Sequence, residues 1–264
     1  MGSRKERNNS VKKKNKGNPL GPKTTKLKPH ATTNNKNTQI EAQPIEKLQP
    51  SAQLNLFLDK FQSANHLKLS SLELDSLTDK CIVDMSTDQD VESLGKRVKA
   101  AFGPSWKEEL CDKRLLEGKV DPGSPAVLII STSALRSIEL LRGFRSLTKE
   151  CHAVKLFSKH MKVDEQVSLL KDRVNIASGT PNRIKKLIDI EALGLSRLSM
   201  IVLDVHPDVK GYSLLTLPQV SDEFWDLYKT YFHQRLLQES LRLSLYGPLK
   251  SDNEFKGKKK RPNE

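Results

Sequence analysis

Ala126-Val127-Leu128-Ile129-Ile130 is an unbroken apolar run bounded on both sides by polar or turn-forming residues. The break before it, Asp121-Pro122-Gly123-Ser124-Pro125, punctuates the chain strongly. Ser131-Thr132-Ser133 follows the run, and a helical pattern of apolar residues begins after it. A short run of this kind is typical of a strand buried on both faces. It therefore predicts one strand-to-helix unit of a parallel α/β sheet.

The same alternation of short apolar runs and helical patterns continues toward the end of the chain. Thr180 followed by Pro181 predicts the start of one helix, because Thr is a capping residue and Pro is tolerated in the first turn. Further strands are predicted over 153–157, 173–177, 198–203 and 241–246, and further helices over 163–170 and 220–238. The series predicts a doubly wound parallel sheet over residues 121–249, with right-handed crossovers.

Residues 51–120, upstream of the break, have helical rather than strand-like patterns. Leu54, Phe57, Leu58 and Phe61 recur at helical spacing, Asp90 precedes a second amphipathic stretch, and Ser105 to Glu108 has the spacing of a capping box. We expect an N-terminal helical layer that either packs on the sheet or precedes it. Trp106 is interpreted as the core anchor of this layer, with a base-stacking platform as the alternative.

The positive charge of the chain lies at its two ends. Residues 1–50 carry 12 Lys/Arg against 3 acidic residues, and 250–264 carry 6 against 3, so most of the net charge of +13 lies outside the centre. Both ends have few large apolar residues, which predicts disordered basic tails. Such tails attract RNA by counterion release, or they act as nuclear localisation signals. The candidate signal residues are Lys12, Lys13, Lys14, Lys258, Lys259, Lys260 and Arg261.

Several function classes are disfavoured by what the sequence contains. No apolar run approaches the ~18 residues of a membrane span, and the N-terminus has no pattern of a secretory signal. Cys81, Cys111 and Cys151 are too scattered for a zinc site or a disulfide framework, and are interpreted as reduced thiols. We therefore predict no membrane association, no metal, no cofactor and no small-molecule substrate.

The residues at the predicted strand ends resemble motifs of the first domain of DEAD-box RNA helicases. Ser131-Thr132-Ser133 is similar to the start of a Pro-Thr-Arg-Glu-Leu motif, although Ala134 and Leu135 replace its Arg and Glu. Thr180-Pro181-Asn182-Arg183 differs from Thr-Pro-Gly-Arg at one position, and Leu203-Asp204 matches the start of the acidic motif. The resemblance covers residues 125–248 and implies a RecA-like fold.

Two of these motifs hold the phosphates of single-stranded RNA in the helicases. The resemblance thus implies RNA-binding candidates on this chain, namely Ser131, Ser133, Arg136, Thr180, Arg183, Lys185 and Lys186. A predicted helix N-terminus beside Thr180 fits that role, because free amides and the helix dipole favour phosphate. The alternative is an ordinary capped helix start with solvated lysines.

The departures from the helicase pattern argue against catalysis. No Gly-x-x-x-x-Gly-Lys-Ser/Thr phosphate loop occurs in the sequence. Val205 stands where the degenerate acidic motif, Asp204-Val205, would need a second carboxylate. We therefore expect no enzyme activity. A divergent ATPase, or a nuclease that uses Asp204 and Asp208, is the catalytic alternative.

The whole chain also resembles the Cms-one family. The similar features are the basic tails, Gly179 to Lys186, Ile201 to Asp204, Phe224 to Tyr228 and Leu245 to Gly247. That family is associated with the small-subunit processome, a nucleolar pre-ribosomal complex containing a box-C/D guide RNA. The resemblance implies pre-ribosomal RNA and processome proteins as partners, and a location in the nucleus and nucleolus. A protein-interaction scaffold without direct RNA contact by the folded domain is the alternative.

Overall fold

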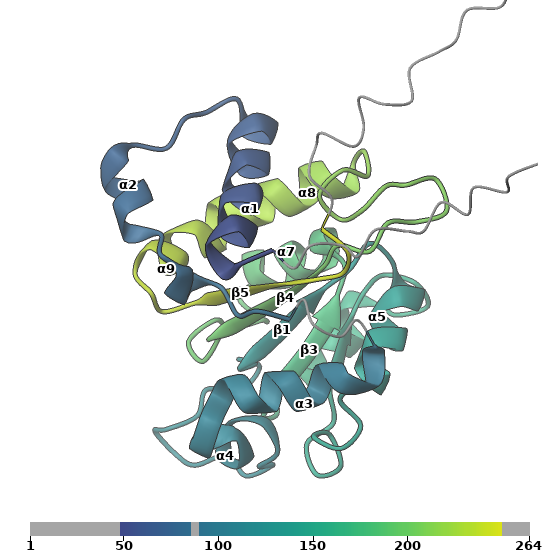
Figure 1. Cartoon of the computed structure of the whole chain (residues 1–264). Helices are drawn as coiled ribbons and strands as arrows, with labels where there is room; N and C mark the ends of the chain where they lie inside the picture. Colours follow the sequence, from purple (N-terminus) through teal and green to yellow (C-terminus); the bar gives the residue numbers. More distant parts are fainter. Residues whose placement is uncertain (1–47, 86–89, 250–264) are drawn as a thin grey trace, which may run out of the picture. The chain divides into compact units, whose positions relative to one another are not determined.

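Five parallel strands form a single sheet at the centre of the computed structural model, which describes residues 48–85 and 90–249 (Figure 1). The strands lie in the order β2-β3-β1-β4-β5, and Val127 of β1 faces Ile176 of β3 and Met200 of β4. Their bounds are β1 Val127–Ile130, β2 Val154–Leu156, β3 Ile176–Gly179, β4 Met200–Asp204 and β5 Arg242–Tyr246. The predicted parallel α/β fold is confirmed.

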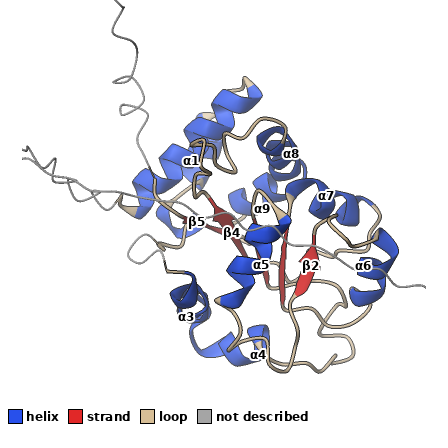
Figure 2. Cartoon of the chain, turned by 90° about the vertical axis from the view of Figure 1, so that its right-hand side faces the viewer, coloured by secondary structure: helices blue, strands red, loops and turns tan. Residues whose placement is uncertain are grey.

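Helices cover both faces of this sheet (Figure 2). The face covered by the later helices bears α1 Pro50–Asn65, α6 Val163–Leu169, α7 Pro181–Asp189, α8 Val220–Leu227 and α9 His233–Leu237. The opposite face bears α3 Val91–Phe102, α4 Trp106–Leu110 and α5 Ala134–Arg142. The short helix α2 Ser71–Ser76 buries none of its residues.

The segment before residue 120 does not form one helical layer, which corrects the prediction. Phe57 of α1 belongs to the core that contains Leu128, whereas Leu94 of α3 belongs to the core that contains Val127. Successive strand residues point to opposite faces, and both faces of this sheet are apolar. The early helices therefore divide between the two faces.

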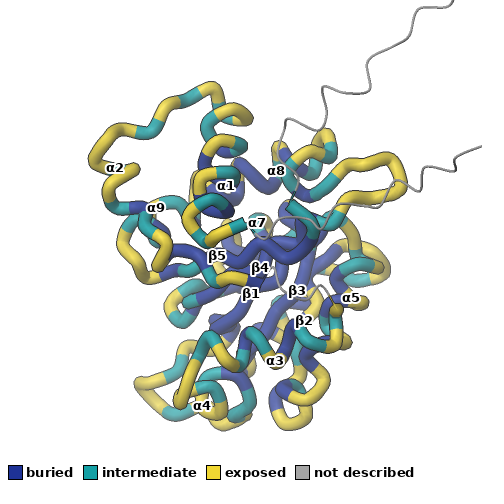
Figure 3. The backbone as a smooth tube through the Cα atoms, in the orientation of Figure 1, coloured by how far each residue is buried: buried dark blue, intermediate teal, exposed yellow. Residues whose placement is uncertain are grey.

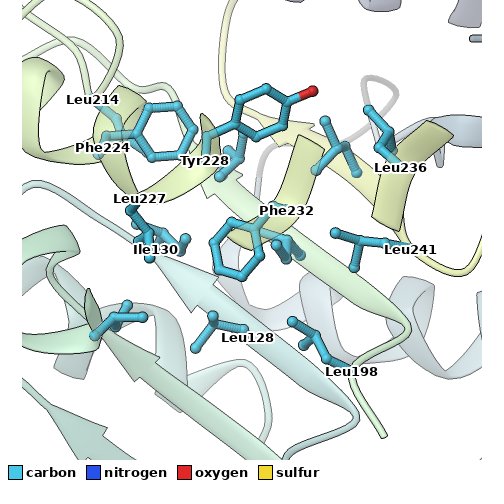
Figure 4. Packing of buried hydrophobic residues seen from close by; sticks show 14 of the residues in the cluster. Leu128, Ile130, Leu198, Leu214, Phe224, Leu227, Tyr228, Phe232, Leu236 and Leu241 are labelled. Atoms are coloured by element: carbon cyan, nitrogen blue, oxygen red, sulfur yellow. The ribbon is translucent and has the colours of Figure 1, made fainter. Parts of the chain in front are cut away.

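The larger core lies between the sheet and the helices α1, α8 and α9. Strand side chains such as Leu128 and Ile130 lie in one cluster with Phe224, Tyr228 and Phe232, as the close view shows (Figure 4). The strands are buried along most of their length (Figure 3). This core therefore joins residues that are far apart in the sequence.

The predicted long helix over 220–238 is interrupted, which is a second correction. A π-helical turn at Tyr228–Phe232 separates α8 from α9. The extra residue in this turn places Phe232, which is fully buried, at an inward position of the helix. The hydroxyl of Tyr231 instead donates to the carboxylate of Asp189 on α7.

The predicted capping contacts also differ from those observed. Asp90 and Thr180 stand at N-cap positions without accepting a side-chain cap bond, and the hydroxyl of Ser105 donates back to the carbonyl of Phe102. The complete capping box is formed by Ser70 and Glu73 at the start of α2. The strand predicted over 173–177 is shifted and begins at Ile176.

Two glycines allow α3 to lie against the end of α5. A Cβ atom on Gly95 would lie 2.2 Å from the carbonyl oxygen of Gly143, and one on Gly143 would lie 2.0 Å from that of Val91. Distances this short to backbone atoms require the two segments to separate. The glycines therefore fix how closely α3 approaches the sheet-covering helix beside it.

We expect Gly95→Ala to lower the free energy of unfolding by about 1–3 kcal/mol, the usual cost of an overpacked contact. In an unobstructed helix the same change would stabilise by up to ~1 kcal/mol, so the sign of the effect reports the contact. Urea denaturation measures it. Lys96→Ala, at an exposed neighbouring position, serves as the control and should change little. A stabilised Gly95→Ala chain would contradict the close approach.

Candidate functional site at the carboxyl ends of the strands

The serines after β1 hold the beginning of α5. The side chain of Ser133 accepts the amide N–H of Arg136 at 3.3 Å and caps the helix. The buried hydroxyl of Ser131 lies 2.8 Å from that of Ser137 and donates to the carbonyl of Ser133. Both predicted RNA-binding serines therefore have partners inside the protein.

Arg136 points from α5 toward the end of β4, where it pairs with Asp204. Its Nε donates to Oδ2 at 2.7 Å and its Nη2 donates to Oδ1 at 3.1 Å. The Asp204 side chain is only 2% exposed, and Arg136 is 21% exposed. The remaining guanidinium nitrogen, Nη1, lies 3.0 Å from the carboxylate of Glu139. The arrangement is a two-point ion pair with little access to solvent.

His206 completes the surroundings of the buried carboxylate. Its Nδ1 lies 2.8 Å from Oδ1 of Asp204, and its ring centre lies 4.8 Å from that of Tyr246 at the end of β5. Gly247 lies against it, because a Cβ atom there would lie 2.9 Å from Nδ1. Asp204 is thus enclosed by groups from α5, the loop after β4 and the end of β5.

These contacts keep Asp204 ionised. Burial raises the pKa of its carboxyl group, but the bonds from His206 and Arg136 outweigh burial and bring the pKa below its ordinary value. Desolvation likewise lowers the pKa of Arg136, and the bonds to Asp204 outweigh it and raise that pKa. A cation that bound Asp204 would have to displace the arginine.

The side chain of Val205 is buried beside this pair. It is 5% exposed and belongs to the larger core, and its amide donates to the carbonyl of Tyr246 at 2.9 Å. The position that would need a water-activating carboxylate is therefore part of an apolar wall. In the described ranges 48–85 and 90–249, no group of three or more His, Cys, Asp and Glu residues could hold a metal ion.

Arg183 is directed away from Arg136. Its Nη1 donates to Oε1 of Gln166 at 2.6 Å and to the carbonyl of Met161 at 3.2 Å. Gln166 is itself buried and donates to the carbonyls of Lys155 and Phe157. Because β3 lies between β2 and β1, Arg183 is bonded toward the β2 side of the sheet while Arg136 is bonded toward β4. The two candidate arginines do not converge on one ligand.

The lysines of α7 lie among carboxylates. Lys185 pairs with Asp189 at 3.1 Å and lies 3.7 Å from Asp226. A small hollow of about 250 Å³ is lined by Asn182, Lys185, Lys186, Asp189, Glu223 and Asp226. Two lysines face three acidic residues there. Thr180 and the exposed Lys186 are the candidates of this segment for which no side-chain bond is recorded among the described residues.

A family model described as U3-containing 90S pre-ribosomal complex subunit, CMS1, matches residues 2–246. The chain belongs to the CMS1 family. The Cms-one resemblance is thereby confirmed, and the family is described as a subunit of a pre-ribosomal complex. None of the helices in the described part of the chain is both long and apolar enough to cross a membrane.

Two relatives illustrate the extent of similarity within the CMS1 family. Protein CMSS1 of Homo sapiens is 35% identical over 146 residues, which cover 54% of this chain and 52% of the human protein. Protein CMS1 of Chaetomium thermophilum is 37% identical over 148 residues, covering 54% of this chain and 57% of that protein. The chain matches about half the length of each of these relatives.

The solved structures that resemble this CMS1-family chain include DEAD-box proteins. Dbp5 of S. cerevisiae, bound to Nup159, Gle1, IP6 and ADP, has a TM-score of 0.40 and 15% identity, covering 76% of this chain and 48% of Dbp5. The yeast splicing factor Prp28 has a TM-score of 0.43 and 11% identity, and the match covers 66% of this chain and 37% of Prp28.

A short segment that the sequence analysis did not predict, Ile82 and Val83, lies beside the edge strand β5. Ile82 forms an isolated parallel bridge with Leu243 of β5, and the amide of Val83 donates to the Leu243 carbonyl at 2.7 Å. The chain then leads into α3. Residues 86–89, between this segment and α3, lie outside the described residues. A phosphate loop needs glycines and a lysine, and the sequence Asp84-Met-Ser-Thr-Asp-Gln-Asp90 contains neither.

Proposed function

We propose that this chain is a non-catalytic subunit of the small-subunit pre-ribosomal complex that binds RNA or ribonucleoprotein during pre-ribosomal RNA processing in the nucleolus. The observation that carries the non-catalytic part is the two-point pair between Arg136 and Asp204. It occupies both oxygens of the carboxylate that a nucleotide-hydrolysing site would use for magnesium. The acidic sequence before α3 and the buried Val205 support the same conclusion.

The proposed partners are pre-ribosomal RNA and proteins of the processome, without a cofactor or small-molecule substrate. Support comes from the family description, which names a U3-containing 90S complex, and from the basic ends of the sequence. Those ends, including the nuclear localisation candidates Lys12–Lys14 and Lys258–Arg261, lie outside the described residues. Their attraction to RNA would be strong at low salt and independent of base sequence.

The described side chains also support an alternative role for the carboxyl edge of the sheet. Arg136 and Arg183 are engaged in internal bonds, and the α7 lysines face carboxylates. A phosphate grip at Thr180 to Lys186 stays a proposal that depends mainly on Thr180 and Lys186. The competing role is a protein-docking platform, with RNA bound only by the ends of the chain.

Nucleotide assays test the non-catalytic proposal. We expect the purified full chain to show no RNA-stimulated ATP hydrolysis, and no rise in melting temperature with magnesium and ATP. RNA-stimulated hydrolysis that disappears in the Asp204→Asn variant would overturn the proposal. The variant is needed because contaminating helicases would not respond to it.

Ultraviolet crosslinking in cells tests the RNA part. Precursor ribosomal RNA crosslinked to peptides from the folded body is the expected result. Crosslinks confined to residues 1–47 and 250–264 would favour the docking platform instead. An absence of crosslinks to ribosomal precursors would remove direct RNA binding from the proposal.

A further inference from the structure

Two adjoining hollows lie at the amino ends of the strands, on the opposite side of the sheet from the Arg136–Asp204 pair. Their volumes are about 800 Å³ and about 700 Å³, and Lys113 and Glu150 line both. The first reaches Trp106 at the start of α4, and the second reaches Lys155 on the edge strand β2. The two hollows are here called the α4–β2 groove, after the elements that they reach, α4 and β2, which are both labelled in Figure 2.

The residues that line the α4–β2 groove carry a small excess of positive charge. They include six basic residues, Lys107, Lys113, Arg114, Lys149, Lys155 and Arg173, and four acidic residues, Glu108, Asp112, Glu150 and Asp172. Residues 51–249 as a whole are nearly balanced, with 27 Lys/Arg and 26 Asp/Glu. Among the acidic residues, the carboxylate of Asp112 is already paired with Arg114. The groove thus offers phosphate a more favourable charge than the hollow on α7.

Trp106 is placed as both a core residue and a groove residue. It packs against the smaller core and lines the first hollow. The ammonium group of Lys99 lies 3.8 Å from its ring centre and that of Lys107 lies 5.7 Å away. An aromatic ring flanked by cations is the combination that single-stranded nucleic acids use, with bases stacked and phosphates neutralised. The predicted core role and the base-stacking alternative are therefore compatible.

We infer that the α4–β2 groove binds single-stranded RNA, with a base against Trp106 and the backbone phosphates along Lys107, Lys113, Lys149 and Lys155. The inference rests on the proposed function and refines it, because it places the RNA contact of the folded body at the amino ends of the strands. The charge on the groove wall favours a polyanion, and the indole favours one that carries stacking bases. An acidic protein segment would use the charge alone.

The two tryptophans provide a readout that is separate from binding by the basic ends. Trp225 is 3% exposed inside a cluster of aromatic rings, whereas Trp106 lines the groove. Titration of the full chain with a 12-nucleotide oligouridylate should quench the emission of Trp106 in a saturable manner. A Trp225→Phe chain isolates the emission of Trp106. If this variant folds poorly, the wild-type chain reports the same quenching above the constant emission of Trp225. A Trp106→Phe chain should show no quenching.

Lysine variants test the proposed phosphate contacts. Lys113→Ala combined with Lys149→Ala should weaken the RNA affinity measured by quenching roughly tenfold at 0.1 M salt. The double variant should also reduce the slope of log K against log salt by about 1.4, since each contact with a single-strand phosphate contributes about 0.7. The matched control is Lys68→Ala combined with Lys80→Ala, which removes two exposed lysines that line neither hollow. This control should leave the quenching unchanged.

The outcomes separate the groove from the broader function. RNA binding seen by fluorescence anisotropy without any change in Trp106 emission would overturn the groove and leave the proposed function in place. No RNA binding in either measurement would overturn both. Equal quenching by a polyglutamate peptide, with the same response to the lysine variants, would show that the groove takes an acidic protein partner, and would also overturn the inference.

Discussion

Replacing Arg136 by alanine is expected to lower the free energy of unfolding by about 3–5 kcal/mol, the range observed when one partner of a buried ion pair is removed. The cause is the carboxylate left behind, because Asp204 is 2% exposed and would lose a two-point donor. His206 would remain 2.8 Å from it and would compensate in part. Urea denaturation at pH 7 measures the loss.

The loss of stability caused by Arg136→Ala should become smaller as the pH falls. In the unchanged chain the pKa of Asp204 lies below its ordinary value. The ionised carboxylate therefore stabilises the folded chain fully above about pH 3.9, the pKa of an aspartate in the unfolded chain. This stabilisation is lost as the pH falls through the lower pKa of the folded chain. Without Arg136, burial dominates and disfavours the ionised form. Protonation of Asp204 then removes the unpaired buried charge from the variant. The difference in the free energy of unfolding between the two chains should therefore become smaller from pH 7 toward pH 4.

Two control variants make this test specific. Arg142→Ala removes an exposed arginine from the same helix and should change stability by less than about 0.5 kcal/mol. Asp204→Asn removes the charge and leaves Arg136 free to pair with Glu139, so it should cost less than Arg136→Ala. If Arg136→Ala behaved like Arg142→Ala, the pair would contribute nothing, and the occupied carboxylate would no longer support a non-catalytic site.

The sheet was predictable because its strands are recognisable from their composition alone. β1 and β4 each lie within the continuous apolar runs found in the sequence or extend them by one residue, since strands covered on both faces need apolar side chains. β5 also lies within its predicted range, although Arg242 and Ser244 alternate with its apolar residues. The exception is β3. Arg173 and Asn175 lie in its predicted range but are buried polar residues that bond the carbonyls of Arg114 and Asp112. They hold the connection before the strand, which begins after them.

The candidate site was harder to predict, because its bonds join residues that are distant in the sequence. Arg136 and Asp204 are 68 positions apart, and each was identified from a separate motif. The motif at Ser131 indicated a residue that faces RNA, whereas the order of the strands places Arg136 beside the end of β4. Local patterns record which residues stand at strand ends. They do not record which neighbouring strand end a long side chain will reach.

The division of the early helices between the two faces could not be read from their patterns for a similar reason. An amphipathic helix shows that one side is buried and leaves its partner unspecified. The ring of Phe57 on α1 packs against Trp225 on α8 and Tyr228 in the π-helical turn, more than 150 positions later. The helical prediction for α1 was correct, and its position required the fold.

Phe57→Ala is expected to lower the free energy of unfolding by about 3–5 kcal/mol, which is the usual cost of removing a fully buried aromatic ring. Phe57 is 0% exposed, and its ring lies 5.0 Å from that of Tyr228 in an edge-on arrangement and 5.4 Å from that of Trp225. Its loss would leave a cavity between α1 and α8. Such a large loss would show that α1 belongs to the same folding unit as the sheet.

The control for Phe57→Ala is Leu72→Ala on α2, where the side chain is 76% exposed and the change should alter stability little. Unfolding followed by the fluorescence of Trp225 and by far-ultraviolet circular dichroism should give coincident transitions in both chains. If α1 were an independent appendage, Phe57→Ala would leave the main transition in place and shift only a minor one.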